Sequence, residues 1–270
     1  MASVTAVSVS TARDDRLAPY RNVPDPELLM QHGVFVAEGR LVVRRLLTDS
    51  QLVTRSVMVT EAALTSLADV LGDKDSLPVY VVPQPVMNEI TGFNIHRGCL
   101  ALGERPAARA LIDLTSVAQR LVAIERVSNA DNVGSIFRNA AAFGVDGVLV
   151  GPSCTDPLYR KAIRTSMGAA LSMPFVEAQP WPDVLKDLHT DGWNVIAMTP
   201  SPAAMPLADV ARVVGANRVV VLVGHEGEGL THDSLAASSY QARIPMAPDA
   251  DSVNVATALA IALYEINSHV

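Results

Sequence analysis

Short apolar runs and amphipathic stretches alternate along most of the chain. Runs of Val, Leu, Ile and Ala without polar alternation predict strands that are buried on both faces, as in a parallel sheet. The predicted strands are Ser56–Thr60, Val79–Val82, Gly98–Leu102, Leu121–Glu125, Gly147–Val150, Trp193–Met198 and Arg218–Val223. Apolar residues spaced three and four apart predict helices between them. The predicted helices are Phe35–Leu47, Glu61–Leu71, Val86–Ile90, Leu114–Gln119, Val133–Phe143 and Val253–Ile266. This alternation predicts an α/β fold.

The order of these elements predicts two domains. Residues 1–12 are small and polar with scattered Val, which is typical of a flexible tail. Residues 13–105 are expected to form a small α/β domain. Residues 106–119 are expected to be a linker, because Glu104–Ala110 contains a proline, small residues and no apolar periodicity. The second domain is expected to cover residues 120–270 and to begin with a βαβ unit.

Composition favours an aliphatic core and a soluble protein. Hydrophobic residues make up 49% of the chain but aromatic residues only 4%, so Val, Leu, Ile and Ala must fill the core. The two cysteines, Cys99 and Cys154, lack the spacing of a disulfide framework or a zinc site, so we expect no metal. The sequence contains neither a leader pattern nor an apolar run of about 18 residues, and we therefore expect a cytoplasmic protein without a membrane span.

The charges give mixed indications about a nucleic-acid partner. A formal net charge of −7 disfavours a polyanionic ligand, since phosphate binding usually leaves a basic footprint. Two local basic clusters exist nevertheless: Arg40, Arg44 and Arg45, and Arg160, Lys161 and Arg164. Charge alone leaves two interpretations open, solvated helix faces or a stripe that follows a phosphate backbone.

Three segments carry glycine or polar residues where an α/β core does not need them. The first is NVGSIFR at residues 132–138, after the first strand of the second domain. Asn132 and Gly134 stand at the mouth of a predicted helix, outside the carboxyl end of a strand, where ligands bind in open α/β sheets. Arg138 follows about one and a half turns later. A capped helix with a surface arginine is the simpler interpretation.

The second segment is GHEGEGL at residues 224–230, directly after a strongly apolar strand. Its three closely spaced glycines indicate a sharp turn or a close approach of the backbone to a ligand. The pattern is neither the glycine fingerprint of dinucleotide-binding folds nor a P-loop. A plain turn from strand to loop is the alternative interpretation.

The third segment joins Ile244-Pro245-Met246 to Ser252-Val253-Asn254 at the start of the last predicted helix. We expect Ser252 to cap that helix and Asn254 to lie in its first turn. Capping does not explain why Asn254 or the Ile-Pro-Met element is present.

In this order and spacing, the three segments resemble the signature motifs of the SpoU (TrmH-like) RNA 2′-O-ribose methyltransferases of the SPOUT superfamily. The first motif of that family, N-x-G-x-x-x-R, is matched by Asn132, Gly134 and Arg138. The second, G-x-E-x-x-G, is matched by Gly224, Glu226 and Gly229. The third is I-P-M followed by S-L-N-V-S/A, and it is matched by Ile244, Pro245, Met246, Ser252 and Asn254.

The resemblance covers about residues 120 to 270 and departs from the family pattern in two places. Val253 stands where Leu is usual, and His225 stands where a small or amide residue is common. Between the first two motifs, RTSMGA at residues 164–169 also resembles the R-x-S-x-G-A element of the family.

The resemblance implies a parallel sheet with a deep trefoil knot, and a homodimer formed through this C-terminal domain. It also implies that the knot loops bind S-adenosylmethionine. The implied cofactor residues are Thr199, Leu222, Gly224, Glu226, Gly229, Ile244, Met246, Val253 and Asn254. The implied reaction is methyl transfer to a ribose 2′-OH of RNA. The implied catalytic residues are Arg138, Asn132, Glu226, Ser252 and Asn254.

The N-terminal part is similar, more loosely, to the substrate-binding domain that precedes many SpoU catalytic domains and that resembles ribosomal proteins which bind kinked RNA. Ala37-Glu38-Gly39 matches a short pattern of that domain. This likeness implies RNA contacts by Arg40, Arg44, Arg160, Lys161 and Arg164. It favours ribosomal RNA over transfer RNA, because the additional domain is typical of enzymes that modify ribosomal RNA.

Two other functions fit parts of the sequence. A small-molecule or dinucleotide enzyme is supported only by the βαβ unit, and it leaves the third motif unused. A non-catalytic RNA-binding or ribosome-assembly factor would not need Arg138, Glu226 and Asn254 together. The motifs specify neither the methylated nucleotide nor a role in antibiotic resistance.

Overall fold

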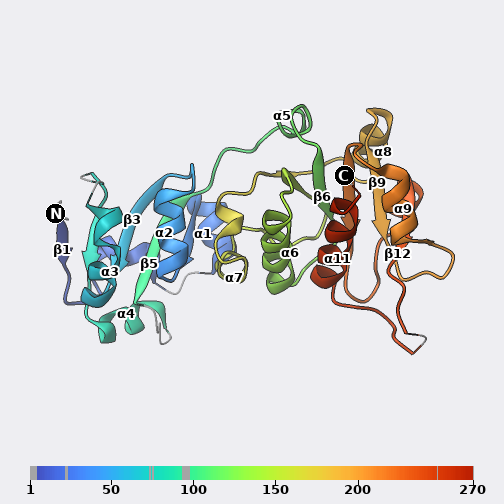
Figure 1. The fold of residues 1–270 in the computed structure, drawn as a ribbon. Helices are drawn as coiled ribbons and strands as arrows, with labels where there is room; N and C mark the ends of the chain where they lie inside the picture. The colour runs from blue at the N-terminus through green and yellow to red at the C-terminus, as the bar shows by residue number, and fades with distance from the viewer. Residues whose placement is uncertain are drawn as a thin grey trace. The chain divides into compact units, whose positions relative to one another are not determined.

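The chain forms two compact units in a computed structural model that describes residues 5–21, 24–72, 74, 76–92, 98–247 and 249–269 (Figure 1). Unit 1 contains the residues up to Ala107 together with Leu158–Ser172. Unit 2 contains Ala108–Pro157 and the residues from Met173 onward. The boundary near Ala107 falls inside the segment 106–119 that was expected to be a linker, but residues 111–115 of that segment form a helix and Leu114 is buried in the core of unit 2. The prediction of one continuous second domain is wrong for residues 158–172, which pack with the first unit.

Unit 1 is built on a five-stranded sheet in the order β1-β4-β3-β5-β2. Its strands are β1 (Ala6–Ser8), β2 (Val34–Glu38), β3 (Thr54–Val59), β4 (Val79–Val81) and β5 (Cys99–Glu104). Strand β5 runs antiparallel to β2 and β3, while β4 pairs in parallel with β1 and β3. The helices are η1 (Asp15–Tyr20), α1 (Asp25–His32), α2 (Arg40–Thr48), α3 (Glu61–Leu71), α4 (Gln84–Thr91), α7 (Arg160–Thr165) and η2 (Ala169–Leu171). The three strands predicted in this part of the chain are confirmed.

The single helix predicted for Phe35–Leu47 is wrong in its first half. Residues 34–38 form strand β2, and α2 begins only after Gly39, whose φ of 96° is incompatible with a helix. Phe35 is buried because it stands opposite Gly103 on β5, where a β-carbon would lie 2.3 Å from the Phe35 ring. Of the apolar residues in this range, Val36 belongs to the buried strand, whereas Val42, Leu46 and Leu47 form the buried face of the helix.

The flexible tail predicted for residues 1–12 is also wrong within its described part. Strand β1 pairs with β4, and the Val9 amide donates to the Val81 carbonyl at 2.9 Å. Val9 and Ala12 are buried in the core of unit 1. Residues 1–4 lie outside the described residues. A three-residue edge strand is too short to leave a periodic pattern in the sequence.

The segment from Leu158 to Ser172 belongs to unit 1 because it packs on β2 and α2. The Arg45 guanidinium donates to the Met167 carbonyl at 2.7 Å. The Ser50 hydroxyl donates to the Leu171 carbonyl at 3.0 Å. These contacts join positions more than 120 residues apart in the sequence, which periodicity within one segment cannot reveal.

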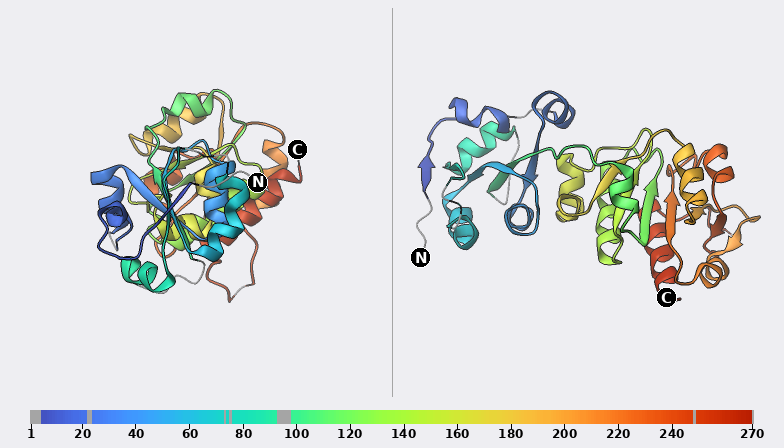
Figure 2. Two further views of the ribbon diagram at one scale, coloured as in Figure 1. Left: turned by 90° about the vertical axis from the view of Figure 1, so that its left-hand side faces the viewer. Right: turned by 90° about the horizontal axis from the view of Figure 1, so that it is seen from above.

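Unit 2 is built on a seven-stranded parallel sheet in the order β10-β12-β9-β11-β6-β7-β8. Its strands are β6 (Arg120–Ile124), β7 (Gly147–Val150), β8 (Phe175–Glu177), β9 (Asn194–Met198), β10 (Met205–Pro206), β11 (Val219–Val223) and β12 (Tyr240–Arg243). The helices are α5 (Leu111–Thr115), α6 (Ala130–Ala142), α8 (Asp183–Thr190), α9 (Leu207–Val214), α10 (His232–Ala236) and α11 (Val255–Asn267). Helices cover both faces of the sheet (Figure 2). The predicted α/β class with a buried parallel sheet is confirmed.

Three predicted helices of this unit begin at other residues than expected. Helix α6 starts at Ala130 because the Asn129 side chain accepts the Asp131 amide, so Asn132 is helical rather than in a loop. Helix α11 is capped by Asn254, not by Ser252. Helix α5 lies three residues before the predicted position, and Leu114 and Ala118 anchor this region in the core.

No helix in the described part of the chain is long and apolar enough to cross a membrane. Burial raises the pKa of the Cys99 thiol to about 12 and that of the Cys154 thiol to about 11. Both thiols are therefore protonated at neutral pH and are poor nucleophiles.

Candidate functional site

A cavity of about 490 Å³ opens at the carboxyl edge of the unit 2 sheet, where β12, β9 and β11 end side by side. Its volume lies in the usual range of small-molecule sites. It is lined by residues 198–201, 223–230, 235, 244, 246, 251–253, 255 and 258. Three chain segments, each following a neighbouring parallel strand, therefore build one site.

Gly224 allows the loop after β11 to fold tightly, because it has no β-carbon. A β-carbon at this position would lie 2.8 Å from the Gly229 carbonyl group and 2.9 Å from Leu230. The Gly229 amide also donates to the His225 carbonyl at 2.9 Å, which closes the loop on itself. Gly229 has a φ of 67°, a conformation that glycine adopts without strain. The two glycines of the second motif are thus required by backbone geometry.

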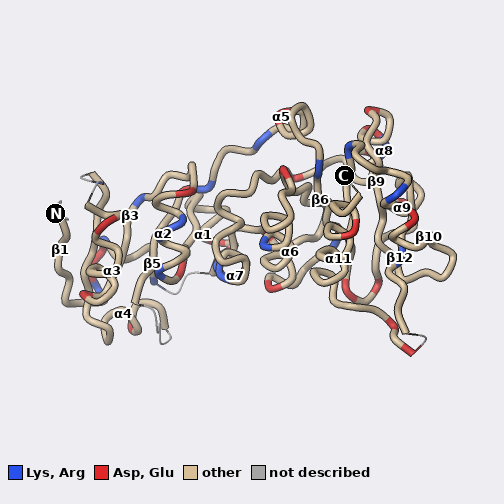
Figure 3. Tube along the Cα trace, viewed as in Figure 1, with Lys and Arg blue, Asp and Glu red and all other residues tan. Residues whose placement is uncertain are grey.

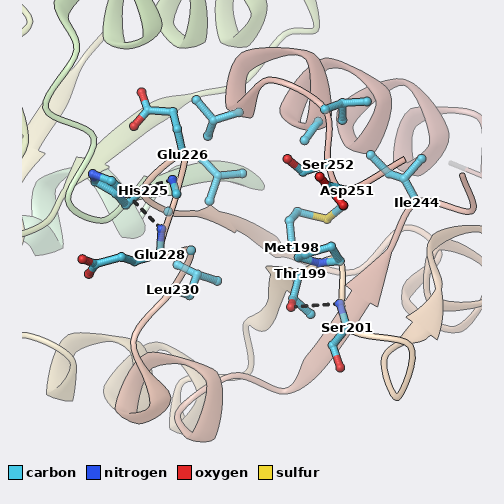
Figure 4. Close-up of a pocket in the computed structure, with 18 of the residues that line it drawn as sticks. Met198, Thr199, Ser201, His225, Glu226, Glu228, Leu230, Ile244, Asp251 and Ser252 are labelled. Atoms are coloured by element: carbon cyan, nitrogen blue, oxygen red, sulfur yellow. Dashed lines mark hydrogen bonds between the residues drawn. The ribbon is translucent and has the colours of Figure 1, made fainter. Parts of the chain in front are cut away.

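The His225 imidazole organises the turn inside this loop. Its Nδ1 accepts the backbone amides of Gly227 at 3.0 Å and Glu228 at 3.1 Å. Because Nδ1 accepts, the ring proton of the neutral imidazole must be on Nε2. Figure 4 shows His225 and Leu230 on one side of the cavity and Met198 and Thr199 on the other.

The buried side chain of Asn132 connects two walls of the cavity. Its Nδ2 donates to the Glu226 carboxylate, and its Oδ1 accepts from Asn254 Nδ2 at 2.9 Å. Asn254 in turn caps α11, because its Oδ1 accepts the amides of Ala256 at 2.9 Å and Thr257 at 3.4 Å. Three of the five predicted catalytic residues therefore form one hydrogen-bonded chain, in which Glu226 lines the cavity and Asn132 and Asn254 lie behind it.

Two further contacts hold the loop to the connection between β6 and α6. The buried Glu125 carboxylate accepts the Thr231 hydroxyl at 2.7 Å and the Thr231 amide at 3.4 Å. Arg126 forms an ion pair with Glu228, and this guanidinium holds the pKa of the Glu228 carboxyl below its usual value. The pair is largely exposed, so the buried Glu125 contact holds the loop more firmly.

Sequence reasoning did not identify Glu125 and Arg126 as site residues. Glu125 directly follows the buried strand β6, where a charged residue needs a polar partner, and this was a usable signal. Arg126 has a φ of 59°, a left-handed conformation that nothing in the sequence pattern indicates. His225 stood out only as a departure from the family pattern.

Seven of the nine residues predicted to bind the cofactor line the cavity, and so does Ser252, which was predicted to be catalytic. The predicted residues that line the cavity are Thr199, Gly224, Glu226, Gly229, Ile244, Met246, Ser252 and Val253. Leu222 does not line it, because its side chain is fully buried in the core beneath the sheet. Asn132 and Asn254 lie behind the lining residues. Arg138 is exposed on α6 and does not line the cavity.

The residues predicted to bind RNA are brought together in unit 1. Arg164 on α7 reaches Glu38, which is two residues before Arg40 at the start of α2. Three of the predicted arginines already contact carboxylates, in the pairs Arg44–Asp69 at 2.5 Å, Arg164–Glu38 at 3.4 Å and Arg160–Asp25 at 4.0 Å. Acidic and basic residues are interspersed along each unit (Figure 3). The two clusters thus share a unit, but acidic partners offset much of their charge.

The described residues include no group of His, Cys, Asp and Glu side chains that could hold a metal ion. The cavity is lined by small residues, by apolar side chains such as those of Leu230, Ile244 and Met246, and by the acidic residues Glu226, Glu228 and Asp251. Such a lining suits an organic ligand with an apolar ring and polar substituents.

The family model and the relatives that match this sequence both describe RNA methyltransferases. A model of the SpoU rRNA Methylase family matches residues 119–264. Proteins named as uncharacterized tRNA/rRNA methyltransferases of Mycobacterium bovis and Mycobacterium tuberculosis are 39% identical over 256 residues, which is 93% of this chain and 88% of theirs.

Solved structures share the fold. An AdoMet-bound rRNA methyltransferase from Sinorhizobium meliloti has a TM-score of 0.83 and 24% identity, covering 98% of both chains. The SpoU methyltransferase AviRb from Streptomyces viridochromogenes, in complex with AdoMet, has a TM-score of 0.77 and 20% identity, covering 94% of this chain and 97% of that one.

The close contact at Gly224 can be tested by Gly224→Ala. We expect the variant to be destabilised by about 1–3 kcal/mol, because the new methyl group meets backbone atoms that cannot move without opening the loop. Urea unfolding measures this loss, and hydrogen exchange should show faster exchange at residues 225–229. Gly227→Ala is the matched control, since its β-carbon would make only ordinary contacts, 3.5 Å from the nearest atom. Equal stability of the two variants would contradict the geometry.

Proposed function

The chain belongs to the SpoU rRNA Methylase family of RNA methyltransferases, and on this premise we propose that it methylates a ribose 2′-OH of RNA with S-adenosylmethionine as the methyl donor. Ribosomal RNA is the favoured substrate and transfer RNA the alternative. The observation that carries the proposal is that the three sequence motifs, far apart in the chain, meet at one cavity of suitable size. A cytoplasmic location fits this substrate.

The residues present fit S-adenosylmethionine in size and chemistry. Gly224 and Gly229 bring backbone groups to the surface of the cavity, and Ile244, Met246 and Leu230 provide an apolar slot of the kind that an adenine ring needs. When bound, this cofactor supplies a methyl group on a sulfonium, which is a strong electrophile. The task left to the protein is to place the ribose and to assist the loss of its hydroxyl proton.

Arg138 is the residue to which the family resemblance assigns this assistance. Arginine is a poor general base, because removing its proton at pH 7 costs about 7–9 kcal/mol, given a pKa above 12. A protonated guanidinium can instead stabilise the developing alkoxide and hold an RNA phosphate. We infer that Arg138 acts in this charged form, whichever group finally takes the proton.

A homodimer through unit 2 would bring Arg138 of one copy close to a neighbouring site. Helix α11 packs along α6, and the two can be followed side by side in Figure 1. On α11, Ile261 and Tyr264 are exposed at 37% and 63%, one turn apart, and Arg138 is exposed on α6. An apolar strip beside a functional arginine supports this face as the contact between copies.

Unit 1 is proposed to bind the RNA substrate. Arg40 lies on α2 and Lys161 and Arg164 lie on α7, and both helices pack on β2 although they are far apart in the sequence. The Arg164–Glu38 contact is long, at 3.4 Å, and the Arg164 side chain is 49% exposed, so an RNA phosphate can replace the carboxylate partner. The additional unit is the reason to favour ribosomal RNA. The trefoil knot implied by the resemblance belongs to this proposal, and it is supported by a cavity built from three separate loops.

The proposed reaction predicts methylation that protects RNA from alkali. Incubated with labelled S-adenosylmethionine, the protein should modify unmethylated ribosomal RNA at a position that then resists alkaline hydrolysis, because a 2′-O-methyl group removes the attacking hydroxyl. Arg138→Ala should lose at least about a hundredfold in rate, the usual effect of removing one group that stabilises transition-state charge. Its affinity for S-adenosylmethionine should be retained, since Arg138 does not line the cavity.

Arg138→Lys is the matched control and should keep part of the activity, because it preserves the charge but not the planar fork. Modification of transfer RNA alone would replace ribosomal RNA as the substrate. Labelled RNA that stays sensitive to alkali would show base methylation and refute the ribose assignment. Full activity of Arg138→Ala would refute the role of this residue.

The dimer contact predicts that Tyr264→Arg produces monomers. A buried arginine without a partner would make the contact between copies unfavourable. Sedimentation velocity should show a dimer for the wild-type protein and a monomer for the variant, with unchanged circular dichroism. Val213→Arg is the control, because Val213 is exposed at 57% on α9 instead. A monomeric wild-type protein would exclude the dimer. A dimeric Tyr264→Arg variant would show that the contact between copies lies elsewhere.

A further inference from the structure

His225 carries a titratable ring at a position where its hydrogen bonds shape the wall of the cavity. We propose that His225 is a positioning residue that supports the cofactor loop only while its imidazole is neutral, so that the affinity of this protein for S-adenosylmethionine falls as the pH drops through the histidine range. This inference rests on the proposed use of S-adenosylmethionine. It concerns one residue at which the chain departs from the common family pattern.

The hydrogen bonds of the His225 ring require a neutral imidazole. Both amides, of Gly227 at 3.0 Å and of Glu228 at 3.1 Å, donate to the same nitrogen, Nδ1 of His225. A neutral imidazole with its proton on Nε2 provides this acceptor. The imidazolium has a proton on both nitrogens, and Nδ1–H would then face two N–H groups. Protonation therefore removes both bonds and adds a repulsive contact.

The turn that these hydrogen bonds shape is part of the cavity wall. Gly227, Glu228 and Gly229 line the cavity, so a rearranged turn alters the surface that the cofactor touches. At the other side of the turn, the Gly229 carbonyl already lies against Gly224. Binding to the ordered loop is thus coupled to the neutral form of His225.

Charged groups around the ring act in opposite directions. Glu226 and Glu228 on the same loop favour the imidazolium, as does Asp251 on the opposite wall of the cavity. Arg126, from the connection between β6 and α6, opposes it and also neutralises Glu228. The Glu125 carboxylate accepts a hydrogen bond from Thr231. The segment 198–201 on the other wall contributes no charged side chain. These charges change the pH at which the affinity for S-adenosylmethionine decreases, but the affinity still decreases toward low pH.

The protonation state of His225 decides in which direction the affinity for S-adenosylmethionine changes with pH. The ordered loop requires the neutral ring, so the ordered state binds fewer protons than the released state. Affinity is therefore highest above the histidine range and decreases as the pH falls through it. Loss of one shared acceptor predicts about five- to tenfold weaker binding, because a hydrogen bond of this kind contributes about 1 kcal/mol.

The test is the dissociation constant of S-adenosylmethionine, measured by calorimetry from about pH 5.5 to about pH 8, the range in which histidine titrates. Wild-type protein should bind about five- to tenfold more weakly at the low end. His225→Asn should lose this dependence, because an amide oxygen can accept the same amides and does not titrate. His225→Phe should bind weakly at every pH. Titration of the cofactor itself affects all variants equally and cancels in the comparison.

His232→Asn is the matched control, since His232 is 94% exposed on α10 and does not line the cavity. It should keep the wild-type pH profile. Identical pH profiles of wild type and His225→Asn would overturn the proposal, as would a wild-type affinity that does not change with pH. Absence of binding by the wild type at every pH would instead count against the proposed cofactor. Thermal unfolding at each pH shows whether a weak variant is folded.

Discussion

The hydrogen-bonded amide of Asn132 is the contact on which the rest of the site depends. It is buried, and both of its polar atoms are used, one toward Glu226 and the other toward Asn254. Glu226 belongs to the loop after β11 and Asn254 begins α11, so one side chain fixes two walls of the cavity. Removing one partner from a buried amide typically costs about 1–3 kcal/mol, which is enough to change the loop geometry. Residues that never touch a ligand can thus decide whether the cavity exists.

Backbone geometry explains why the rest of the site consists of small residues. The cavity lies where three parallel strands end, and the loops that follow supply glycines and other small residues beside the carboxylates of Glu226, Glu228 and Asp251. Gly224 leaves space for the Gly229 carbonyl, and His225 Nδ1 accepts the amides of Gly227 and Glu228 between them. Recognition by backbone groups requires an exact loop shape. This requirement accounts for the several contacts that hold one loop, from Glu125, Arg126 and Asn132.

The sequence predicted the elements with strong local patterns and missed those that depend on distant contacts. The apolar runs at β6, β7 and β11 were identified because strands buried on both faces are continuous in sequence. The strand Val34–Glu38 was assigned to a helix, since only its pairing with β5 distinguishes the two. Likewise, the motifs indicated the site but not the packing of residues 158–172 on unit 1 or the role of Glu125. Those features arise from contacts between residues that are far apart in the chain.

Calorimetric titration of S-adenosylmethionine into wild-type protein and Asn254→Asp tests the central claim most directly. Aspartate still caps α11 but cannot donate to Asn132, so this variant removes the connection between the walls without removing the helix cap. We predict that the wild type binds and that Asn254→Asp binds about tenfold more weakly or worse, with and without RNA. Equal affinities would show that the Asn132 connection does not shape the cavity. Absence of binding by the wild-type protein under both conditions would contradict the account as a whole.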